Sequence, residues 1–145
     1  MIKFELTSNA PQFAKLPVRS SKYSAGYDFF ATGEAHILPG DVVIMGTGVK
    51  AKMDRDCVLL ILPRSSMGIK KGIVLANGTG VIDSDYYNNE DNEGEILIAL
   101  RNYGKKVVHI CTGDKIAQGL FTKYLKCTGD SVRAERKGGI GSTGR

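Results

Sequence analysis

The apolar runs of this chain are short, and their length restricts the folds open to it. Residues 58–62 and 96–100 are each continuously apolar over only five positions. A run of this length is too short for an independent helix and is typical of a strand covered on both faces. Residues 2–7 alternate apolar and polar side chains, which indicates a strand with one buried face. The chain therefore begins in a sheet and builds its core from strands.

Two longer segments also favour strands. Residues 41–53 are rich in valine and isoleucine, and the two glycines within them indicate a bend or a bulge. Residues 115–124 are ambiguous, since apolar and aromatic side chains recur there at helical spacing. Gly119 in the middle of that segment disfavours a helix, and a Gly-Asp turn directly precedes it. No other segment has a stronger helical pattern, so the sequence predicts an all-β fold.

The size of the chain indicates a single core. With 145 residues, 42% of them hydrophobic, it amounts to one domain. Folding should bury roughly 70% of the surface of the extended chain. No N-terminal run resembles a signal peptide, and no segment approaches the ~20 apolar residues that cross a bilayer. We therefore expect a cytoplasmic protein that makes no membrane contact.

Charge and cysteine content argue against several functional classes. The formal net charge of +5 suits an anionic ligand, but the basic residues form no dense stripe, so direct binding to nucleic acid is not expected. Cys57, Cys111 and Cys127 are odd in number and widely spaced. This spacing fits neither a disulfide framework nor a zinc knuckle, and it predicts buried thiols.

The most informative stretch for function is residues 77–87, Asn-Gly-Thr-Gly-Val-Ile-Asp-Ser-Asp-Tyr-Tyr. Its glycines allow a tight turn or a close backbone approach, and Asp83 directly follows an apolar pair. A carboxylate at the edge of an apolar wall can hold an ordered water and act as a general base. Tyr86 could form the floor of a pocket. The alternative interpretation is an ordinary β-hairpin with aspartates in its turns.

Two further polar groups adjoin apolar strands. Residues 63–66 (Pro-Arg-Ser-Ser) end the run at 58–62, and an arginine with two hydroxyls at the start of a short helix suits a phosphate. The alternative is a simple helix cap. Asp28 lies within the aromatic strand 25–31, where an unpaired carboxylate would be costly. It therefore needs a structural partner or a metal-bound water, and the sequence leaves both open.

Two segments contribute little to a core. Residues 88–95 are acidic and polar, which predicts a solvated loop. A calcium loop of EF-hand type, counted from Asp83, would have Tyr87 and Asn88 where an oxygen ligand and a glycine are required, which argues against calcium. Residues 136–145 are rich in glycine and should be mobile when alone. Their Gly-x-Gly-x-x-Gly pattern is not followed by a strand-to-helix unit, so it is no dinucleotide fingerprint. With its serine, threonine and arginine, this tail can still surround phosphates with donors.

Five separated segments together resemble the motifs of the trimeric dUTP diphosphatases (dUTPases). They occur in the same order as in that family and lie at residues 25–28, 63–66, 80–86, 113–118 and 138–144. The resemblance implies a distorted β jelly roll over residues 1–135 and a flexible C-terminal arm over residues 136–145 that closes over the active site. It also implies a homotrimer with shared active sites. The activity implied is Mg²⁺-dependent hydrolysis of dUTP to dUMP and diphosphate, which limits uracil incorporation into DNA and supplies dUMP.

The resemblance also implies a role for each motif. Asp83 would activate the water that attacks the α-phosphorus, and Tyr86 would lie against the deoxyribose and leave no space for a 2′-hydroxyl. Asp28 would contact the water shell of an Mg²⁺ ion held mainly by substrate phosphates. The other motif residues would bind the substrate, and these are Arg64, Ser65, Ser66, Asn77, Gly80, Val81, Ile82, Gln118, Arg136, Gly139, Ile140, Gly141, Ser142 and Thr143.

The chain departs from the family pattern at three places. Ile140 occupies a position where the family usually has a phenylalanine that stacks on uracil, so closure of the arm should be weaker or different. Ser66 replaces a commoner glycine. The loop at 88–95 is longer than the tight turn of many relatives.

These departures leave two alternative functions. One is a dCTP deaminase-like enzyme, because Pro-Arg-Ser-Ser also occurs in that family. Such an enzyme needs a glutamate base near the pyrimidine, whereas no glutamate lies near Asn77 and the Asp85-Tyr86 pair is present. The other is a regulatory protein of dUTPase fold that binds a repressor, for which the acidic loop at 88–95 would be the contact surface.

Overall fold

The computed structural model describes residues 1–144 and confirms the all-β fold. It contains a single α-helix within these residues, α1 (Ser65–Lys71), and a 3-10 turn at Ser84–Tyr86. The strands are β1 (Lys3–Leu6), β2 (Val18–Arg19), β3 (Tyr27–Phe30), β4 (Ala35–Ile37), β5 (Val42–Gly46), β6 (Val49–Lys52), β7 (Cys57–Leu62), β8 (Ile73–Leu75), β9 (Gly80–Asp83), β10 (Leu97–Asn102), β11 (Val108–Ile110) and β12 (Lys115–Lys123).

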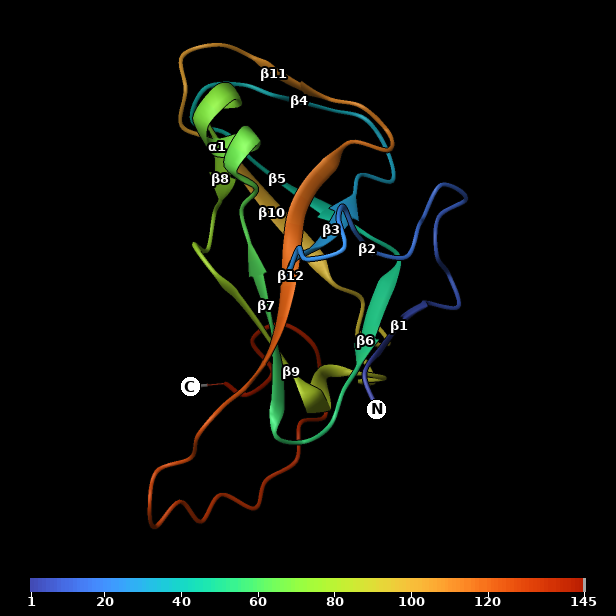
Figure 1. Ribbon diagram of the computed structural model, residues 1–145, viewed down its shortest axis with the longest axis vertical. Coiled ribbons are helices and arrows are strands. Elements are labelled where there is room, and N and C mark those ends of the chain that lie inside the picture. The colour runs from blue at the N-terminus through green and yellow to red at the C-terminus, as the bar shows by residue number, and fades with distance from the viewer. Residues whose placement is uncertain (145) are drawn as a thin grey trace.

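Two antiparallel sheets enclose the core. The larger has the strand order β2-β3-β12-β7-β9 and the smaller has the order β5-β10-β8, while β1 pairs with β6 and β11 pairs with β4 (Figure 1). The side chains buried most completely come from both sheets and from the segments that join them, and they include Phe29, Ile37, Leu59, Ile98, Leu100 and Ile116. Strands that cross between two packed sheets are typical of a jelly roll.

The ambiguous segment at 115–124 is a strand, as the glycine within it predicted. β12 pairs with β3 on one side and with β7 on the other, which makes it the central strand of the larger sheet. Gly119 is required at its position because a Cβ atom there would lie 2.8 Å from the ring of Phe29. The close approach of ring and backbone explains why a glycine interrupts a central strand.

The hairpin interpretation of residues 77–87 is wrong. β8 pairs with β10 in the smaller sheet, whereas β9 pairs with β7 in the larger one, so the turn at 76–79 crosses between sheets. Gly78 adopts a φ of 73° in this turn, and its N–H donates to the Leu75 carbonyl. β7 and β10 are each six residues long and offer more backbone partners than the short strands β8 and β9 offer each other.

The segment at 41–53 bends more sharply than a bulge would require. It divides into β5 and β6, which belong to different sheets, and Gly48 lies between them with a φ of 67°. The cysteine prediction is partly wrong. Cys57 is buried at the start of β7, but Cys111 lies in the exposed turn before β12 and Cys127 in the exposed segment after it. Within residues 1–144, no helix is long and apolar enough to span a membrane.

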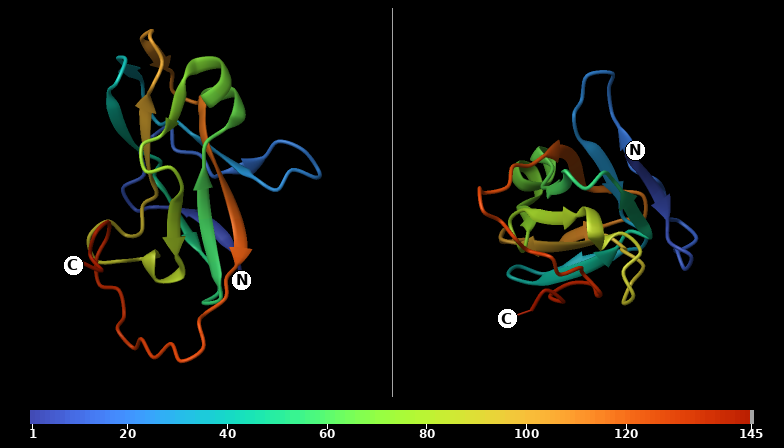
Figure 2. Two further views of the ribbon diagram at one scale, coloured as in Figure 1. Left: turned by 90° about the vertical axis from the view of Figure 1, so that its left-hand side faces the viewer. Right: turned by 90° about the horizontal axis from the view of Figure 1, so that it is seen from below.

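The C-terminal segment follows β12 along the outside of the molecule and returns to β9. Residues 124–135 are exposed and form no strand, while residues 136–144 lie against the 3-10 turn and the loop at 88–95 (Figures 1 and 2). Gly138 and Gly139 are buried there. We call residues 136–144 the arm. Its mobility stays a prediction.

Candidate active site

Asp83 is the last residue of β9 and stands at the edge of an apolar pocket. β9 pairs antiparallel with β7, which places Asp83 opposite Val58. The backbone turns into a 3-10 helix directly after Asp83, and its side chain is about half exposed (51%). One carboxylate oxygen, Oδ2, accepts a hydrogen bond from Arg136. No donor among residues 1–144 contacts Oδ1, so this oxygen remains available to a water.

Arg136 joins the arm to Asp83 and to the turn that follows it. Its Nη2 lies 3.0 Å from Asp83 Oδ2, its Nε lies 3.2 Å from Asp85 Oδ1, and its guanidinium carbon lies 5.7 Å from the centre of the Tyr86 ring. Nη1 donates to the Gly139 carbonyl and to Ser142 Oγ. The guanidinium is therefore held by two carboxylates, an aromatic face and its own arm.

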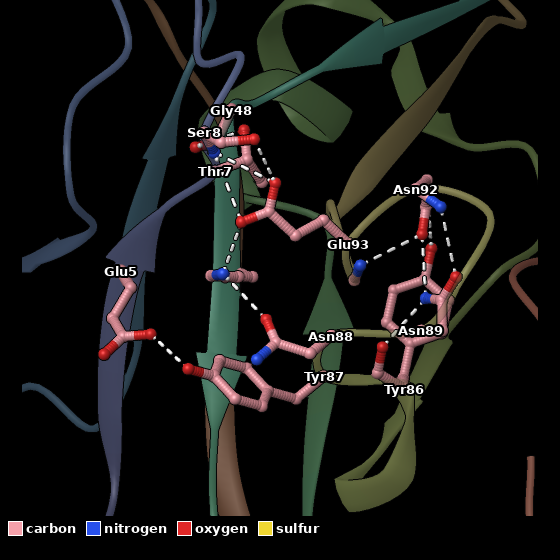
Figure 3. Close-up of polar contacts among 12 residues, drawn as sticks. Glu5, Thr7, Ser8, Gly48, Tyr86, Tyr87, Asn88, Asn89, Asn92 and Glu93 are labelled. Carbon is pink, nitrogen blue, oxygen red and sulfur yellow. Dashed lines mark hydrogen bonds and ion pairs between the residues drawn. The ribbon is translucent and has the colours of Figure 1, made fainter.

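Tyr86 is fixed both by burial and by hydrogen bonds. Only 6% of the residue is exposed. Its hydroxyl donates to the Glu95 carbonyl at 2.9 Å. The same hydroxyl accepts from Asn92 Nδ2 at 2.8 Å (Figure 3). Because the residue is buried and its hydroxyl is bonded twice, the ring has a fixed orientation beside the pocket.

The pocket beside Asp83 has a volume of about 240 Å³. Its walls come from β7, β8, β9 and β10, and the arm closes one side. Nine of the residues predicted to bind substrate line it, and these are Asn77, Gly80, Val81, Ile82, Tyr86, Arg136, Ile140, Gly141 and Thr143. Gly80 is needed close to β7, since a Cβ atom there would lie 3.1 Å from Ile61 Cβ. Gly139 and Ser142 do not line the pocket, but both contact Arg136.

A second polar cluster surrounds Asp28. Arg64 Nε lies 3.0 Å from Asp28 Oδ1, and Lys115 Nζ lies 2.8 Å from Oδ2, which also accepts from Ser20. Burial raises the pKa of Asp28, but the bonds from Lys115 and Ser20 and the charge of Arg64 outweigh it, and the net effect is a lowered pKa. The sequence left two roles open for Asp28, a structural partner or contact with a metal-bound water. The structure shows that structural partners are present.

Arg64, Ser65 and Ser66 lie where β7 gives way to α1. The residue at the N-cap of α1 is Arg64, no side chain caps the helix, and both serines are exposed. The ordinary helix-cap interpretation therefore does not account for these hydroxyls. Gln118 lies nearby, because it stands opposite both Asp28 and Leu62, and its Nε2 donates to the Pro63 carbonyl.

The two clusters lie apart within one chain. Val58, the partner of Asp83, stands near the start of β7, and Arg64 follows six residues later, just beyond its end. At about 3.3 Å per residue, the separation along the strand is roughly 20 Å. The structure thus gathers Asp83, the pocket residues and the arm in one place. It gathers Asp28, Arg64, Ser65, Ser66 and Gln118 in another.

Several residues of these clusters were not predicted from the sequence. Ser20 and Lys115 hold Asp28, and Asp85 shares Arg136 with Asp83. The aspartate and the lysine stand inside recognised motifs, so their charge was an available signal. Ser20, in contrast, lies in a loop and carries no such signal.

The prediction of a solvated loop at 88–95 is correct only in part. The segment is a loop, and its residues 88, 90 and 91 are exposed, but others are held inside the fold. Asn89 is buried, and Asn92 contacts Tyr86. Asp91 accepts a hydrogen bond from the N–H of Gly139 in the arm. Asparagine side chains mimic backbone groups in turns, and this explains how a loop without apolar residues is ordered.

The fold and the pocket place this chain among all-β proteins in which a glycine-rich C-terminal segment covers a small ligand pocket. Comparison with known proteins gives the family. The chain matches the dUTPase family over residues 12–144, and it belongs to that family.

Relatives of this chain support the same assignment. The Lactococcus lactis subsp. lactis deoxyuridine 5'-triphosphate nucleotidohydrolase is 45% identical over 131 residues, which cover 89% of this chain and 87% of that protein. The crystal structure of the Streptococcus mutans dUTPase superposes with a TM-score of 0.81 at 40% identity, covering 87% of this chain and 98% of the other. A mutant dUTPase of phage phi11 of S. aureus, described with a structural Mg(II) ion, shares the fold at a TM-score of 0.74 and 21% identity, covering 92% of this chain and 97% of that one.

Proposed function

We propose that this dUTPase hydrolyses dUTP to dUMP and diphosphate with Asp83 as the general base, in active sites completed by neighbouring subunits. The observation that carries the proposal is the position of Asp83. It stands at the edge of the pocket with Oδ2 held by Arg136 and Oδ1 unengaged among the described residues. The family assignment supports the reaction and does not favour the dCTP deaminase or the regulatory alternative.

Asp83 would act on a water in line with the α-phosphorus. Oδ1 takes a proton from the water, and the resulting hydroxide attacks phosphorus while the bond to the oxygen that bridges to the β-phosphorus breaks. The electrons of that bond leave with diphosphate. Arg136 fixes the orientation of the carboxylate through Oδ2, and the same guanidinium can stabilise the charge that develops on the phosphates.

The pocket suits the base and sugar of a nucleotide. Its volume of about 240 Å³ is smaller than the ~300 to 1,000 Å³ typical of pockets for drug-sized ligands, so it suits the nucleoside part of the substrate rather than the whole triphosphate. The Asn77 amide and the backbone of β9 supply polar partners for uracil. The fixed ring of Tyr86 would exclude a 2′-hydroxyl by steric contact, which discriminates better than an apolar wall, since such a wall rejects an added hydroxyl by only about 10²-fold.

The separation of the two clusters supports a shared site. A nucleotide bound at Asp83 cannot place its phosphates on Arg64 of the same chain if these residues lie roughly 20 Å apart along β7. A homotrimer would bring Arg64, Ser65, Ser66 and Gln118 of one subunit to the pocket of another. A cyclic trimer repeats this contact three times and closes.

The residues present fit Mg²⁺ as an ion held through the substrate. Among residues 1–144, no group of three His, Cys, Asp or Glu side chains is placed to cage a metal. Both Asp28 oxygens are already engaged, so Asp28 would contact only the water shell of the ion. Mg²⁺ retains several waters and commonly binds through substrate phosphates. When bound, it would neutralise the charge of the phosphates.

Diphosphate release from dUTP, dCTP, dTTP and UTP tests the proposed function. We expect rapid release from dUTP in the presence of Mg²⁺ and little from the other three. Ammonia release from dCTP would instead identify a deaminase. Absence of any turnover, in a protein that binds dUTP, would contradict an enzymatic role.

A further inference from the structure

The loop at 88–95 is held in a defined conformation by its own side chains. Asn89 is buried, and its Oδ1 accepts from the backbone N–H groups of Asp91 and Asn92 at 3.0 and 3.1 Å. Asn89 Nδ2 donates to the Tyr86 carbonyl and to Asn92 Oδ1. Asn92 Oδ1 also accepts from the Gly94 N–H (Figure 3). The amide groups of two asparagines thus replace the backbone ladder that a sheet would provide.

The same loop is fastened to the β domain at its base. Lys50, on β6, donates to Asn88 Oδ1 at 2.7 Å and forms an ion pair with Glu93. Glu93 also accepts from the N–H and the hydroxyl of Ser8. Asn88 and Glu93 have φ angles of 58° and 61°, in the left-handed region that asparagine tolerates but that is uncommon for glutamate. The contacts of Lys50 and Ser8 therefore hold the base of the loop in one shape, including the uncommon backbone conformation of Glu93.

The outer edge of the loop contacts the arm. Asp91 Oδ2 accepts from the Gly139 N–H at 2.6 Å, and the Glu90 N–H donates to the Lys137 carbonyl at 3.1 Å. The fit is close, because a Cβ atom on Gly138 would lie 2.4 Å from Asp91 Oδ2. A carboxylate that accepts from a backbone N–H makes a stronger bond than a neutral acceptor would.

The inner edge of the loop contacts Tyr86. Asn92 Nδ2 donates to the Tyr86 hydroxyl at 2.8 Å and to the Glu95 carbonyl at 3.2 Å. One loop thus holds two parts of the pocket that are far apart in the sequence. These two parts are the Tyr86 ring, which is proposed to lie against the sugar, and the glycines of the arm.

We propose that the loop at 88–95 is a positioning element for catalysis, in which Asp91 latches the arm in its closed position over bound nucleotide. Asp91 is a positioning residue, since it contacts the arm and not the pocket. This inference rests on the proposed function, in that closure of the arm brings Arg136 and its neighbours to the phosphates.

The test compares three single variants of the whole protein. Asp91→Ala removes the acceptor, whereas Asp91→Asn retains an oxygen at the same place without the charge. Glu90→Gln is the matched control, because it removes one negative charge from the same loop while leaving the Glu90 N–H in place. Glu90 is exposed, and its side chain makes no hydrogen bond or ion pair with residues 1–144.

Two measurements report whether Asp91 holds the arm closed. The first is kcat and KM for dUTP with saturating Mg²⁺. The second is the rate of tryptic cleavage after Lys137, with and without a non-hydrolysable imido analogue of dUTP, read by mass spectrometry. Cleavage after Lys126, in the exposed segment that precedes the arm, is the internal reference in each digest.

We expect Asp91→Ala to lower kcat about tenfold to a hundredfold with a smaller effect on KM, because the arm's donors matter most in the transition state. Cleavage after Lys137 should become faster relative to Lys126, both without nucleotide and with the analogue. Asp91→Asn should recover part of both effects, and Glu90→Gln should resemble wild type. The thermal midpoint should stay near that of wild type in all three variants.

Wild-type kcat and wild-type protection of Lys137 in Asp91→Ala would overturn the latch, as would equal losses in Asp91→Ala and Glu90→Gln. Failure of the proposed function is distinguishable, because it would show as absent dUTP turnover in the wild-type protein. The cleavage ratio in the nucleotide-free protein still decides in that case whether Asp91 holds the arm.

Discussion

Arg136 Nη2 lies 3.0 Å from Asp83 Oδ2, so the arm is bonded directly to the proposed general base. The same guanidinium bonds Asp85 and lies over the Tyr86 ring. An arginine in this position couples arm closure to the orientation of the base. Bound phosphates would compete with the two carboxylates for the N–H donors of Arg136. The position of the arm would then depend on bound substrate.

Asp83→Asn should abolish most turnover while preserving the shape of the site. The amide cannot take a proton from water, and we expect kcat to fall on the order of 10²- to 10⁴-fold. Asp85→Asn is the matched control, because Asp85 is similarly exposed and shares Arg136 with Asp83. Steady-state diphosphate release is the measurement. Equal losses in the two variants would show that only the anchoring of Arg136 matters.

Mixed trimers should recover activity from two inactive proteins. If Asp83 and Arg64 of one site come from different subunits, a trimer of Asp83→Asn and Arg64→Ala subunits contains sites with both native residues. Random mixing restores about a quarter of the sites. The measurement is diphosphate release after joint refolding, beside analytical ultracentrifugation that should find a trimer. No recovery in a mixture shown to form hybrids would mean that each site lies within one chain.

Tyr86→Ala should weaken discrimination against UTP. Removal of the ring opens space beside the sugar, so kcat/KM for UTP should rise relative to dUTP. Tyr86→Phe is the control, since it retains the ring and loses only the bonds to Glu95 and Asn92. The preference ratio for the two substrates is the quantity to compare. An unchanged ratio in Tyr86→Ala would place sugar selection elsewhere.

The parts of the fold that local sequence determines were predictable. The five-residue apolar run at 58–62 became β7, and Gly119 correctly indicated that its segment is a strand. The hairpin was predicted wrongly because pairing partners are a nonlocal property. The neighbouring strands β8 and β9 pair with β10 and β7, respectively, and not with each other.

The residues of the candidate site also differ in how far the sequence could predict them. The placement of Asp83 and Tyr86 beside the same arginine of the arm was predictable because their motif is contiguous in sequence, while their roles stay predictions. The contact of Asp91 with Gly139 spans 48 residues, and no pattern near either residue indicates it. Asp91 stands in a run of acidic and amide residues, where composition predicts only solvation. Its role depends on the turn that Asn89 and Asn92 build, which is visible only in the structure.

The loop at 88–95 should lose stability in acid because of Glu93. Hydrogen bonds from Lys50 and Ser8 lower the pKa of Glu93 to about 2 from an ordinary value of 4.5. Since the folded-state pKa is lower than the unfolded one, the contribution is complete above about pH 4.5 and disappears as the pH falls toward about 2.

Urea unfolding of wild type and Glu93→Gln between pH 7 and pH 3 measures this contribution. The stability difference between the two proteins should shrink below about pH 4.5. Glu90→Gln, whose side chain has no partner among residues 1–144, should show no such trend. A constant difference for Glu93→Gln across this range would contradict the ion pair with Lys50.

Ile140 offers the most direct test of how the arm covers the base. It lines the pocket yet remains 75% exposed, and it lacks the flat face that stacks on a pyrimidine. A stacked aromatic pair contributes about 0.5 to 1.5 kcal/mol beyond buried area, so Ile140→Phe should raise kcat/KM for dUTP between a few-fold and about tenfold.

Deletion of residues 136–145 should leave a folded trimer with almost no turnover, because the phosphate donors of the arm are lost. Comparison of the three proteins at one Mg²⁺ concentration separates the possibilities. If the truncated protein retains full kcat/KM, the arm is not a lid; if the truncation is inactive and Ile140→Phe gives no gain, the arm closes through Arg136 and Asp91 rather than by stacking on uracil.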